Sequence, residues 1–261
     1  IKTKIESLET VAIDSNKNHH TIIAFLGCLK AGVTYFFLDL KLPKNRISII
    51  LKQTKATILF SSKKFFFEGV QSQIIKNFSK KKKIYYSNCD SSKPAYIMFT
   101  SGSTGNPKGA VITHANILNF TAWCRSTFSL SHKDNFSQLN PLYFDNSVFD
   151  LYNSFLLGGT LTLIKSLDIN NPESLIMALK KNKCSVWFST PSLLIYLINF
   201  ELLNKKNFKF LKKIIFGGEG FPKEKLKKMI KILGSKKDYF NVYGPTECTC
   251  ICSAHFIRNN D

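Results

Sequence analysis

In the stretch YIMFTSGSTGNPKG, residues 96–109, an apolar segment runs directly into a loop rich in glycine and hydroxyl groups. Gly102 and Gly105 allow the backbone to turn tightly and to approach an anion closely. The loop also carries five side chains that can donate to an anion: Thr100, Ser101, Ser103, Thr104 and Lys108. A second apolar stretch, residues 110–112, follows at once, which is not typical of a flexible linker. We therefore expect a phosphate-binding loop between two strands.

The loop differs from the P-loop of the nucleotide triphosphatases. That motif has glycine directly before its lysine and serine or threonine directly after it. Here Pro107 precedes Lys108 and Gly109 follows it. The phosphate-binding residues therefore belong to another kind of α/β protein.

Apolar periodicity along the chain alternates between helical and strand patterns, which predicts α/β layering around largely parallel sheets. The expected strands are 33–38, 57–60, 160–164, 185–189, 213–216 and 239–242. The expected helices are 21–31, 113–128 and those beginning near Pro43, Asn146, Pro172, Pro191 and Pro222. Residues 65–79 fit neither pattern well.

Length and composition indicate one large globular unit or two fused layers. The chain has 261 residues, 44% of them hydrophobic, which is ample for a packed core. No apolar run approaches a membrane span, and the first thirty residues lack a signal peptide's continuous apolar region. Seven cysteines favour free thiols in a reducing compartment, so we expect a cytoplasmic protein without a membrane span.

The chain is strongly basic, with 37 Lys and Arg against 17 Asp and Glu and a net charge of +20. Such a charge could serve nucleic acid or an anionic membrane surface. The lysines are dispersed, however, and the one tight run, Lys80–Lys83, lies in an expected loop. We interpret the excess as solvated charge, which can attract ATP, and expect no nucleic-acid partner.

Five further segments, taken with residues 96–109, resemble the adenylate-forming (AMP-binding) enzyme superfamily. They are LKAGVTYFFLD (29–39), FDNSVFDLY (144–152), WFSTPS (187–192), FGGEGFP (216–222) and NVYGPTE (241–247). The similarity is greatest to the branch that activates amino acids, which includes D-alanine-activating ligases and the adenylation domains of nonribosomal peptide synthetases. It implies two largely parallel sheets with layered helices, as in the family's large N-terminal domain. Residues 1–261 would then form part of that domain, without its start and without the C-terminal lid subdomain.

The resemblance implies ATP-dependent activation of an amino acid as aminoacyl-AMP, with release of pyrophosphate. Mg²⁺ would accompany ATP, and the aminoacyl group would pass to the phosphopantetheine thiol of a carrier protein. The alternative within the family is a ligase that adenylates an acyl or aryl acid, so that the substrate is a small amino or carboxylic acid.

The same resemblance assigns residues to the nucleotide. Tyr243 offers a flat face to adenine, Asn241 an amide to its polar edge, Thr246 a hydroxyl to phosphate and Glu247 an oxygen ligand to magnesium. Lys108, Thr246 and Glu247 are the expected catalytic residues. The full nucleotide set is Thr100, Ser101, Gly102, Ser103, Thr104, Gly105, Lys108, Gly218, Glu219, Asn241, Val242, Tyr243, Gly244, Pro245 and Thr246.

Asp145 distinguishes the alternatives, because a carboxylate at a helix start suits a ligand ammonium or the helix's own N-cap. In amino-acid-activating members of the family, this aspartate binds the substrate α-amino group. By position the substrate pocket would further include Phe149, Gly217, Val242 and Cys250. Gly217 departs from the D-alanine ligase pattern, in which a cysteine stands before Gly-Glu.

Cys248, Cys250 and Cys252 alternate along what the pattern predicts to be a strand, so they would point to one face. Structural zinc usually uses C-x-x-C turns that wrap the ion, which this spacing does not provide. We therefore expect small buried thiols here.

Overall fold

The computed structural model describes residues 10–75, 89–101 and 107–258, which divide into two compact units. Unit 1 comprises residues 1–117 and 142–144, and unit 2 comprises residues 118–141 and 145–261. The boundary falls inside one helix, α4 (His114–Thr127). Among the described residues, no helix combines the length and apolar character needed to cross a membrane.

Unit 1 is built on a six-stranded sheet of order β4-β3-β1-β2-β5-β6, parallel except for the β5–β6 pair. Its strands are β1 (Thr10–Asp14), β2 (Thr34–Leu38), β3 (Ile58–Ser61), β4 (Gln71–Ile74), β5 (Pro94–Ser101) and β6 (Pro107–Thr113), and its helices are α2 (His19–Ala31) and α3 (Lys44–Thr54). The strand β4 lies within the stretch that the sequence left unassigned.

Helices cover both faces of the first sheet at β2, which explains the continuous apolar run of that strand. Phe25 of α2 packs edge-on against Tyr35 of β2, with ring centroids 5.3 Å apart. Phe36, which points the other way, belongs to a core cluster that includes Ile47 and Ile50 of α3. Neighbouring residues of β2 therefore serve opposite layers, as the pleat of a strand requires.

Local capping sets the helix ends that the sequence predicted. Gly32 ends α2 in the left-handed region, with φ 65°, and its N–H bonds back to the last turn. Thr113 and Asn116 cap α4 reciprocally: the Asn116 N–H donates to the Thr113 hydroxyl at 3.2 Å, and the Thr113 N–H donates to Asn116 Oδ1 at 3.0 Å. These short-range bonds explain why both boundaries could be predicted.

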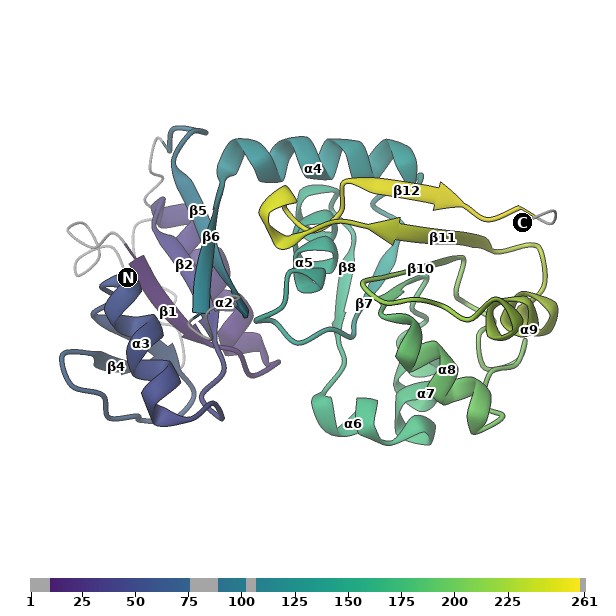
Figure 1. Ribbon diagram of the computed structural model, residues 1–261, viewed down its shortest axis with the longest axis horizontal. Coiled ribbons are helices and arrows are strands. Elements are labelled where there is room, and N and C mark those ends of the chain that lie inside the picture. Colours follow the sequence, from purple (N-terminus) through teal and green to yellow (C-terminus); the bar gives the residue numbers. More distant parts are fainter. Residues whose placement is uncertain (1–9, 76–88, 102–106, 259–261) are drawn as a thin grey trace. The chain divides into compact units, whose positions relative to one another are not determined.

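Unit 2 repeats the scheme with a six-stranded sheet of order β12-β11-β10-β9-β7-β8, parallel except for the β11–β12 pair (Figure 1). Its strands are β7 (Asn135–Gln138), β8 (Thr160–Leu163), β9 (Val186–Ser189), β10 (Lys213–Gly217), β11 (Asp238–Tyr243) and β12 (Ser253–Phe256). Its helices are α5 (Asn146–Leu156), α6 (Ser166–Asn170), α7 (Pro172–Lys181), α8 (Pro191–Asn199), α9 (Lys223–Leu233) and the 3₁₀ turn η1 (Thr246–Cys248).

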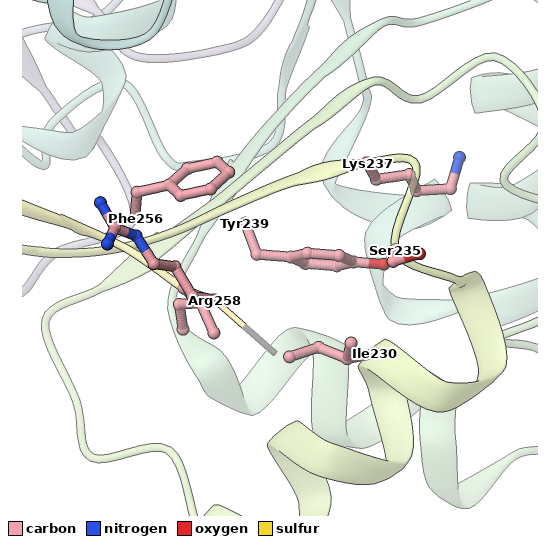
Figure 2. A pocket seen from close by; sticks show the side chains of 7 residues that line it. Ile230, Ser235, Lys237, Tyr239, Phe256 and Arg258 are labelled. Atoms are coloured by element: carbon pink, nitrogen blue, oxygen red, sulfur yellow. The ribbon is translucent and has the colours of Figure 1, made fainter. Parts of the chain in front are cut away.

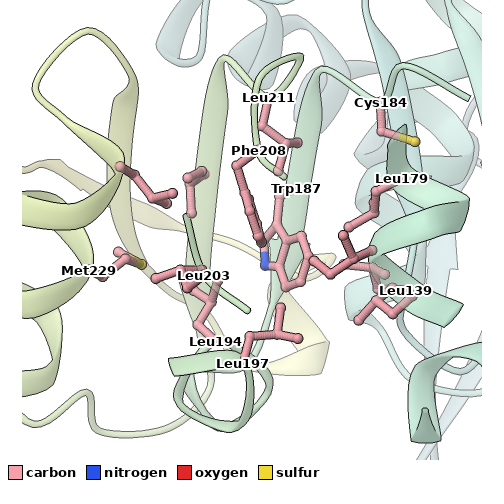
Figure 3. Packing of buried hydrophobic residues seen from close by; sticks show 14 of the residues in the cluster. Leu139, Leu179, Cys184, Trp187, Leu194, Leu197, Leu203, Phe208, Leu211 and Met229 are labelled. Atoms are coloured by element: carbon pink, nitrogen blue, oxygen red, sulfur yellow. The ribbon is translucent and has the colours of Figure 1, made fainter. Parts of the chain in front are cut away.

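The second sheet is also buried on both faces. On one face Trp187 lies at the centre of a cluster formed with residues of α7, α8 and α9 (Figure 3). Its indole N–H is satisfied by the Ser189 hydroxyl at 2.8 Å. On the other face Phe149 of α5 packs against Phe136 and Phe188 of the sheet. The predicted class, two largely parallel sheets with layered helices, is confirmed.

Candidate functional site

The expected phosphate loop connects the antiparallel strands β5 and β6 of unit 1. Thr100, at the end of β5, lies opposite Lys108 of β6. The Thr100 hydroxyl donates to the Lys108 carbonyl oxygen at 3.4 Å, and the Lys108 side chain is exposed. Ser101 is the last residue of β5. Gly102, Ser103, Thr104 and Gly105 lie outside the described residues, so their phosphate role stays a prediction.

In unit 2 the NVYGPTE segment leads from β11 into a compact loop that returns as β12. The Cys252 N–H closes this loop by donating to the Tyr243 carbonyl at 2.9 Å. Gly244 is packed so closely against the returning chain that a Cβ there would lie 2.4 Å from the Cys250 carbonyl oxygen. Thr249 and Cys250 then turn with positive φ angles of 72° and 121°. Such angles strain non-glycine residues, and they typically mark functional turns held by their surroundings.

The loop brings Thr246 to Asp145, although 101 residues separate them in the sequence. The Thr246 hydroxyl donates to Asp145 Oδ2 at 2.5 Å. Asp145 precedes α5 with φ −59° and ψ −29°, and its side chain accepts no N-cap hydrogen bond. The carboxylate thus lacks the usual N-cap bond, but hydrogen bonds with the backbone of Asn146 and of Asp145 itself act on it together with the Thr246 hydroxyl.

Electrostatics at Asp145 favour the arrival of a cation. Burial raises the pKa of its carboxyl group, hydrogen bonds with the Thr246 hydroxyl and the Asn146 backbone oppose that rise, and the negative charge of Glu247 adds to it. A half-buried carboxylate that has a neutral donor and a like charge nearby gains much from an ammonium partner. The arrangement thus suits a ligand that carries a positive charge.

Cys250 lies beside this carboxylate and beside Phe149. Burial raises the pKa of the Cys250 thiol well above its usual value, with further contributions from the charges of Asp145, Cys124 and Asp150, against a hydrogen bond with the Phe149 backbone. The thiol is therefore protonated and behaves as a small apolar side chain. The structure brings together three of the predicted substrate residues: Asp145, Phe149 and Cys250.

The other two predicted substrate residues, Gly217 and Val242, are neighbours at the carboxyl ends of β10 and β11. A Cβ on Gly217 would lie only 2.2 Å from the Val242 carbonyl oxygen. Glycine at this position thus permits the two strand ends to approach closely. A side chain at this position would therefore require the two strand ends to move apart.

The predicted nucleotide residues of unit 2 are mostly accessible. Tyr243 is 68% exposed at the end of β11, and Asn241 and Glu247 are exposed as well. Mg²⁺ usually takes one or two carboxylates and completes its shell with phosphate oxygens and water. Exposed Glu247, one residue from Thr246, fits that pattern, while Val242 is buried and can offer only backbone atoms.

Glu219 already has a structural partner. It follows Gly218, which has φ 89°, and its carboxylate accepts hydrogen bonds from the hydroxyl and the N–H of Ser192. Ser192 lies in the first turn of α8, where a negative charge is favourable. The predicted nucleotide role of Gly218 and Glu219 stays a prediction, and Glu219 has this second role beside it.

The strand predicted through Cys248, Cys250 and Cys252 is wrong. Cys248 ends η1, Cys250 lies in the positive-φ turn, and Cys252 precedes β12. Cys250 is buried as expected, whereas Cys248 and Cys252 are exposed. The alternation in sequence is thus not one face of a strand, because the backbone reverses between the cysteines.

A separate cleft of about 240 Å³ lies near the amino-terminal end of β11. Figure 2 shows Tyr239, Phe256 and Lys237 around it, with Ile230 of α9. The Lys237 ammonium donates to the carbonyl oxygens of residues 208 and 211 at 2.7 and 2.6 Å, and burial lowers its pKa. Because ligands of open α/β sheets bind at the carboxyl ends of the strands, we do not assign this cleft to the chemistry.

Sequence reasoning did not predict the contact between Thr246 and Asp145. The residues were assigned separately, one to phosphate and one to the substrate amine. Nothing local in either motif indicates the pairing, because it depends on where the β11–β12 loop lies relative to α5.

Comparison with known proteins gives a family and a set of relatives. The model of the AMP-binding enzyme family matches residues 2–261. The D-alanine–D-alanyl carrier protein ligases of Bacillus cytotoxicus and Bacillus cereus are each 34% identical, over 238 and 237 residues. Each match covers 87% of this chain and 47% of the relative, so the chain spans about half the length of these curated relatives.

Solved structures share the fold. The nonribosomal peptide synthetase FmoA3 with bound α-methyl-L-serine-AMP superposes with a TM-score of 0.87 at 22% identity, over 97% of this chain and 29% of that one. The Vibrio cholerae adenylation domain AlmE in complex with glycyl-adenosine-5'-phosphate gives 0.82 at 21% identity, over 97% and 53%.

Proposed function

This chain belongs to the AMP-binding enzyme family, and from that premise we propose that the protein uses ATP to activate an amino acid as its aminoacyl adenylate. The observation that carries the amino-acid assignment is the half-buried Asp145 carboxylate, which lies at the start of α5 and accepts from the Thr246 hydroxyl of a distant loop. A carboxylate so placed suits the α-ammonium of a substrate. The 34% identity to D-alanyl carrier protein ligases supports the same class of substrate.

In the proposed reaction, a substrate carboxylate oxygen attacks the α-phosphorus of ATP. The bond from that phosphorus to the bridging oxygen breaks, and pyrophosphate leaves with the bonding electrons. Lys108 and the hydroxyls of the β5–β6 hairpin would offset charge on the departing phosphates, and Thr246 would donate to a phosphate oxygen. Loss of one preorganised donor typically lowers the rate about a hundred- to a thousandfold.

Mg²⁺ would be held by Glu247 together with phosphate oxygens and would neutralise charge on the polyphosphate. Tyr243 would stack on adenine, and Asn241 would meet its polar edge. The ring of Tyr243 is accessible for this purpose because the strand ends there and the chain turns away at Gly244.

The second half-reaction would transfer the aminoacyl group to a thiol. A thiolate of the phosphopantetheine arm on a carrier protein would attack the adenylate carbonyl, and AMP would leave. The relatives named for a D-alanyl carrier protein support this acceptor. All seven cysteines of the chain are free thiols, which fits a reducing, ATP-supplied compartment such as the cytoplasm.

ATP–pyrophosphate exchange by the full-length protein tests the proposal. The panel would pair D- and L-amino acids with their des-amino acids, and we expect exchange only with an amino acid. Lys108→Ala and Glu247→Gln should each lower turnover about a hundredfold, since each removes charge near the polyphosphate or its magnesium.

Lys93→Ala is the matched control, because Lys93 is exposed and stands just before β5, at the other end of the same hairpin. It should keep full exchange. Activity within a factor of two of wild type for both Lys108→Ala and Glu247→Gln would contradict the mechanism. Faster exchange with des-amino acids than with amino acids would instead favour an acyl- or aryl-acid ligase.

A further inference from the structure

The Thr246 hydroxyl has one proton and two proposed acceptors. A hydroxyl group donates one hydrogen bond. In this structure the donation goes to Asp145 Oδ2, at 2.5 Å. The proposed function also requires Thr246 to donate to a phosphate of the nucleotide, and one proton cannot serve both oxygens at once.

Backbone hydrogen bonds hold the chain on either side of Thr246, so the hydroxyl can change its acceptor by rotation of the side chain. The Cys248 N–H donates to the Pro245 carbonyl at 2.9 Å, and the Thr249 N–H donates to the Thr246 carbonyl at 3.1 Å. Gly244 is packed against the returning chain on one side of η1, and the positive-φ turn at Thr249 lies on the other. A change of partner by the hydroxyl therefore needs a side-chain rotation and no movement of the loop.

Release of Thr246 by Asp145 is favoured when another strong donor replaces the hydroxyl, since without one the carboxylate keeps the backbone hydrogen bonds of Asn146 and Asp145 alone among those given for it. Its carboxylate is half-buried beside the protonated Cys250 thiol, and Glu247 adds a like charge nearby. Taking the Thr246 hydroxyl away from such a group is costly. A substrate ammonium supplies a charge-assisted hydrogen bond, which is stronger than a neutral hydroxyl provides.

We propose that the Thr246 hydroxyl couples amino-acid binding to nucleotide binding by changing partners. In the free protein it donates to Asp145, and when the substrate ammonium occupies Asp145 it turns to a phosphate oxygen of the nucleotide. This inference rests on the proposed function and makes Thr246 a positioning residue for Asp145 as well as a phosphate donor.

The exchange predicts positive, reciprocal linkage. An amino acid that frees the hydroxyl raises nucleotide affinity, and the nucleotide must raise amino-acid affinity by the same factor. Coupling between sites is typically about 5- to 150-fold. A single neutral hydrogen bond belongs at the low end of that range, so we expect the amino acid to raise nucleotide affinity about five- to tenfold.

The test is titration calorimetry on the full-length protein, with α,β-methylene ATP and Mg²⁺ as the nucleotide probe. The methylene bridge prevents release of the pyrophosphate group, so binding is measured without reaction. The nucleotide Kd is determined alone, with the amino acid that gives the fastest exchange, and with its des-amino acid. For D-alanine, the des-amino acid is propionate.

We expect the amino acid to lower the nucleotide Kd about five- to tenfold in the wild type and in Thr246→Ser, which keeps the hydroxyl. In Thr246→Val the ratio of the two Kd values should fall to about one, whatever the absolute affinity. Asp145→Asn should lose the linkage too, and the des-amino acid should produce none in any variant.

The outcomes separate this inference from the function on which it rests. Exchange activity in the wild type together with an unchanged Kd ratio, or with a ratio that survives in Thr246→Val, overturns the coupling and leaves the function intact. Absence of exchange with every amino acid overturns both.

Discussion

At the two ends of the second sheet, a buried aspartate and a half-buried aspartate have different kinds of partner. At the amino-terminal end, Asp134 accepts from the Lys213 ammonium at 3.2 and 3.3 Å and from the Ser185 hydroxyl at 2.9 Å. At the carboxyl-terminal end, Asp145 has a neutral hydroxyl as its partner, and burial raises its pKa. Asp134 is thus paired with a cation of its own chain, whereas Asp145 can still pair with the positive charge of a ligand.

Backbone geometry does not divide the two ends so simply. Positive φ values occur before β8 and β9, at Gly158 and Lys183, as well as after β10, at Gly218. What is particular to the carboxyl end is the pair of consecutive non-glycine residues with positive φ, Thr249 and Cys250, in the loop that brings Thr246 to Asp145.

The largest effect should come from Asp134→Ala, which leaves the buried Lys213 ammonium without its carboxylate. Breaking a buried ion pair from one side costs about 3–5 kcal/mol, so we expect a loss of that size in the free energy of unfolding. Urea denaturation of the full-length protein measures it. The adjacent exposed lysine gives the control: Lys212→Ala should change stability by less than about 0.5 kcal/mol. If Asp134→Ala lowers the free energy of unfolding by less than about 1 kcal/mol, the Asp134–Lys213 ion pair does not stabilise this end of the sheet.

Asp145→Asn should affect binding and spare stability, because asparagine can still accept from Thr246. Without its charge, the site loses a charge-assisted bond to the substrate ammonium, and amino-acid binding should weaken by about 2–5 kcal/mol. Nucleotide affinity measured without amino acid should hardly change. If the variant keeps its preference for the amino acid over the des-amino acid, the carboxylate does not recognise the ammonium, and the contrast between the two ends fails.

Gly217→Ala tests the close approach of β10 and β11 at the carboxyl end. The added methyl group would meet the Val242 carbonyl oxygen at 2.2 Å, so the strand ends must separate. Overpacking of this kind costs about 1–3 kcal/mol of stability, which urea denaturation can detect. Gly220→Ala is the matched control, since a Cβ there meets no atom within 4 Å. Equal stability of the two variants would mean that β10 and β11 can move apart at Gly217 without loss of stability.

The smallest effect concerns pH. Amino-acid binding requires the Asp145 carboxylate, and burial raises its pKa, so affinity should start to fall at a higher pH than an exposed aspartate would give. One proton accounts for at most about a tenfold loss per pH unit below that pKa. The folded protein holds this proton more tightly than the unfolded chain, so the same shift reduces stability as pH rises through the raised pKa.

Binding of the amino acid measured across pH, in the wild type and in Asp145→Asn, checks this expectation. The acid limb should disappear in the variant. If the acid limb persists in Asp145→Asn, a group other than Asp145 causes the loss of affinity at low pH.

Much of the fold was predictable because its causes are local. Apolar periodicity indicated both layers of α/β structure, Gly32 marked the end of α2, and Thr113 marked the start of α4. Motif composition likewise indicated which residue types could meet phosphate, adenine and an ammonium. These assignments remain predictions, and Gly102 to Gly105 lie outside the described residues.

The strand predicted from Cys248 to Cys252 failed for an equally physical reason. Alternation of side-chain types says nothing of φ, and Thr249 and Cys250 adopt positive φ values that local preference disfavours. Packing of Gly244 against the returning chain, together with the closure between Tyr243 and Cys252, imposes that turn. Tertiary contact overrode the local pattern.

The sequence by itself determined the class of fold, the family and the residue types available to the site. Only the tertiary structure decided that Asp145 accepts from Thr246, because that contact joins residues 101 positions apart in the sequence. Periodicity and capping act over a few residues, whereas the pairing of a half-buried carboxylate depends on which donor the packed sheet and its loops bring within reach.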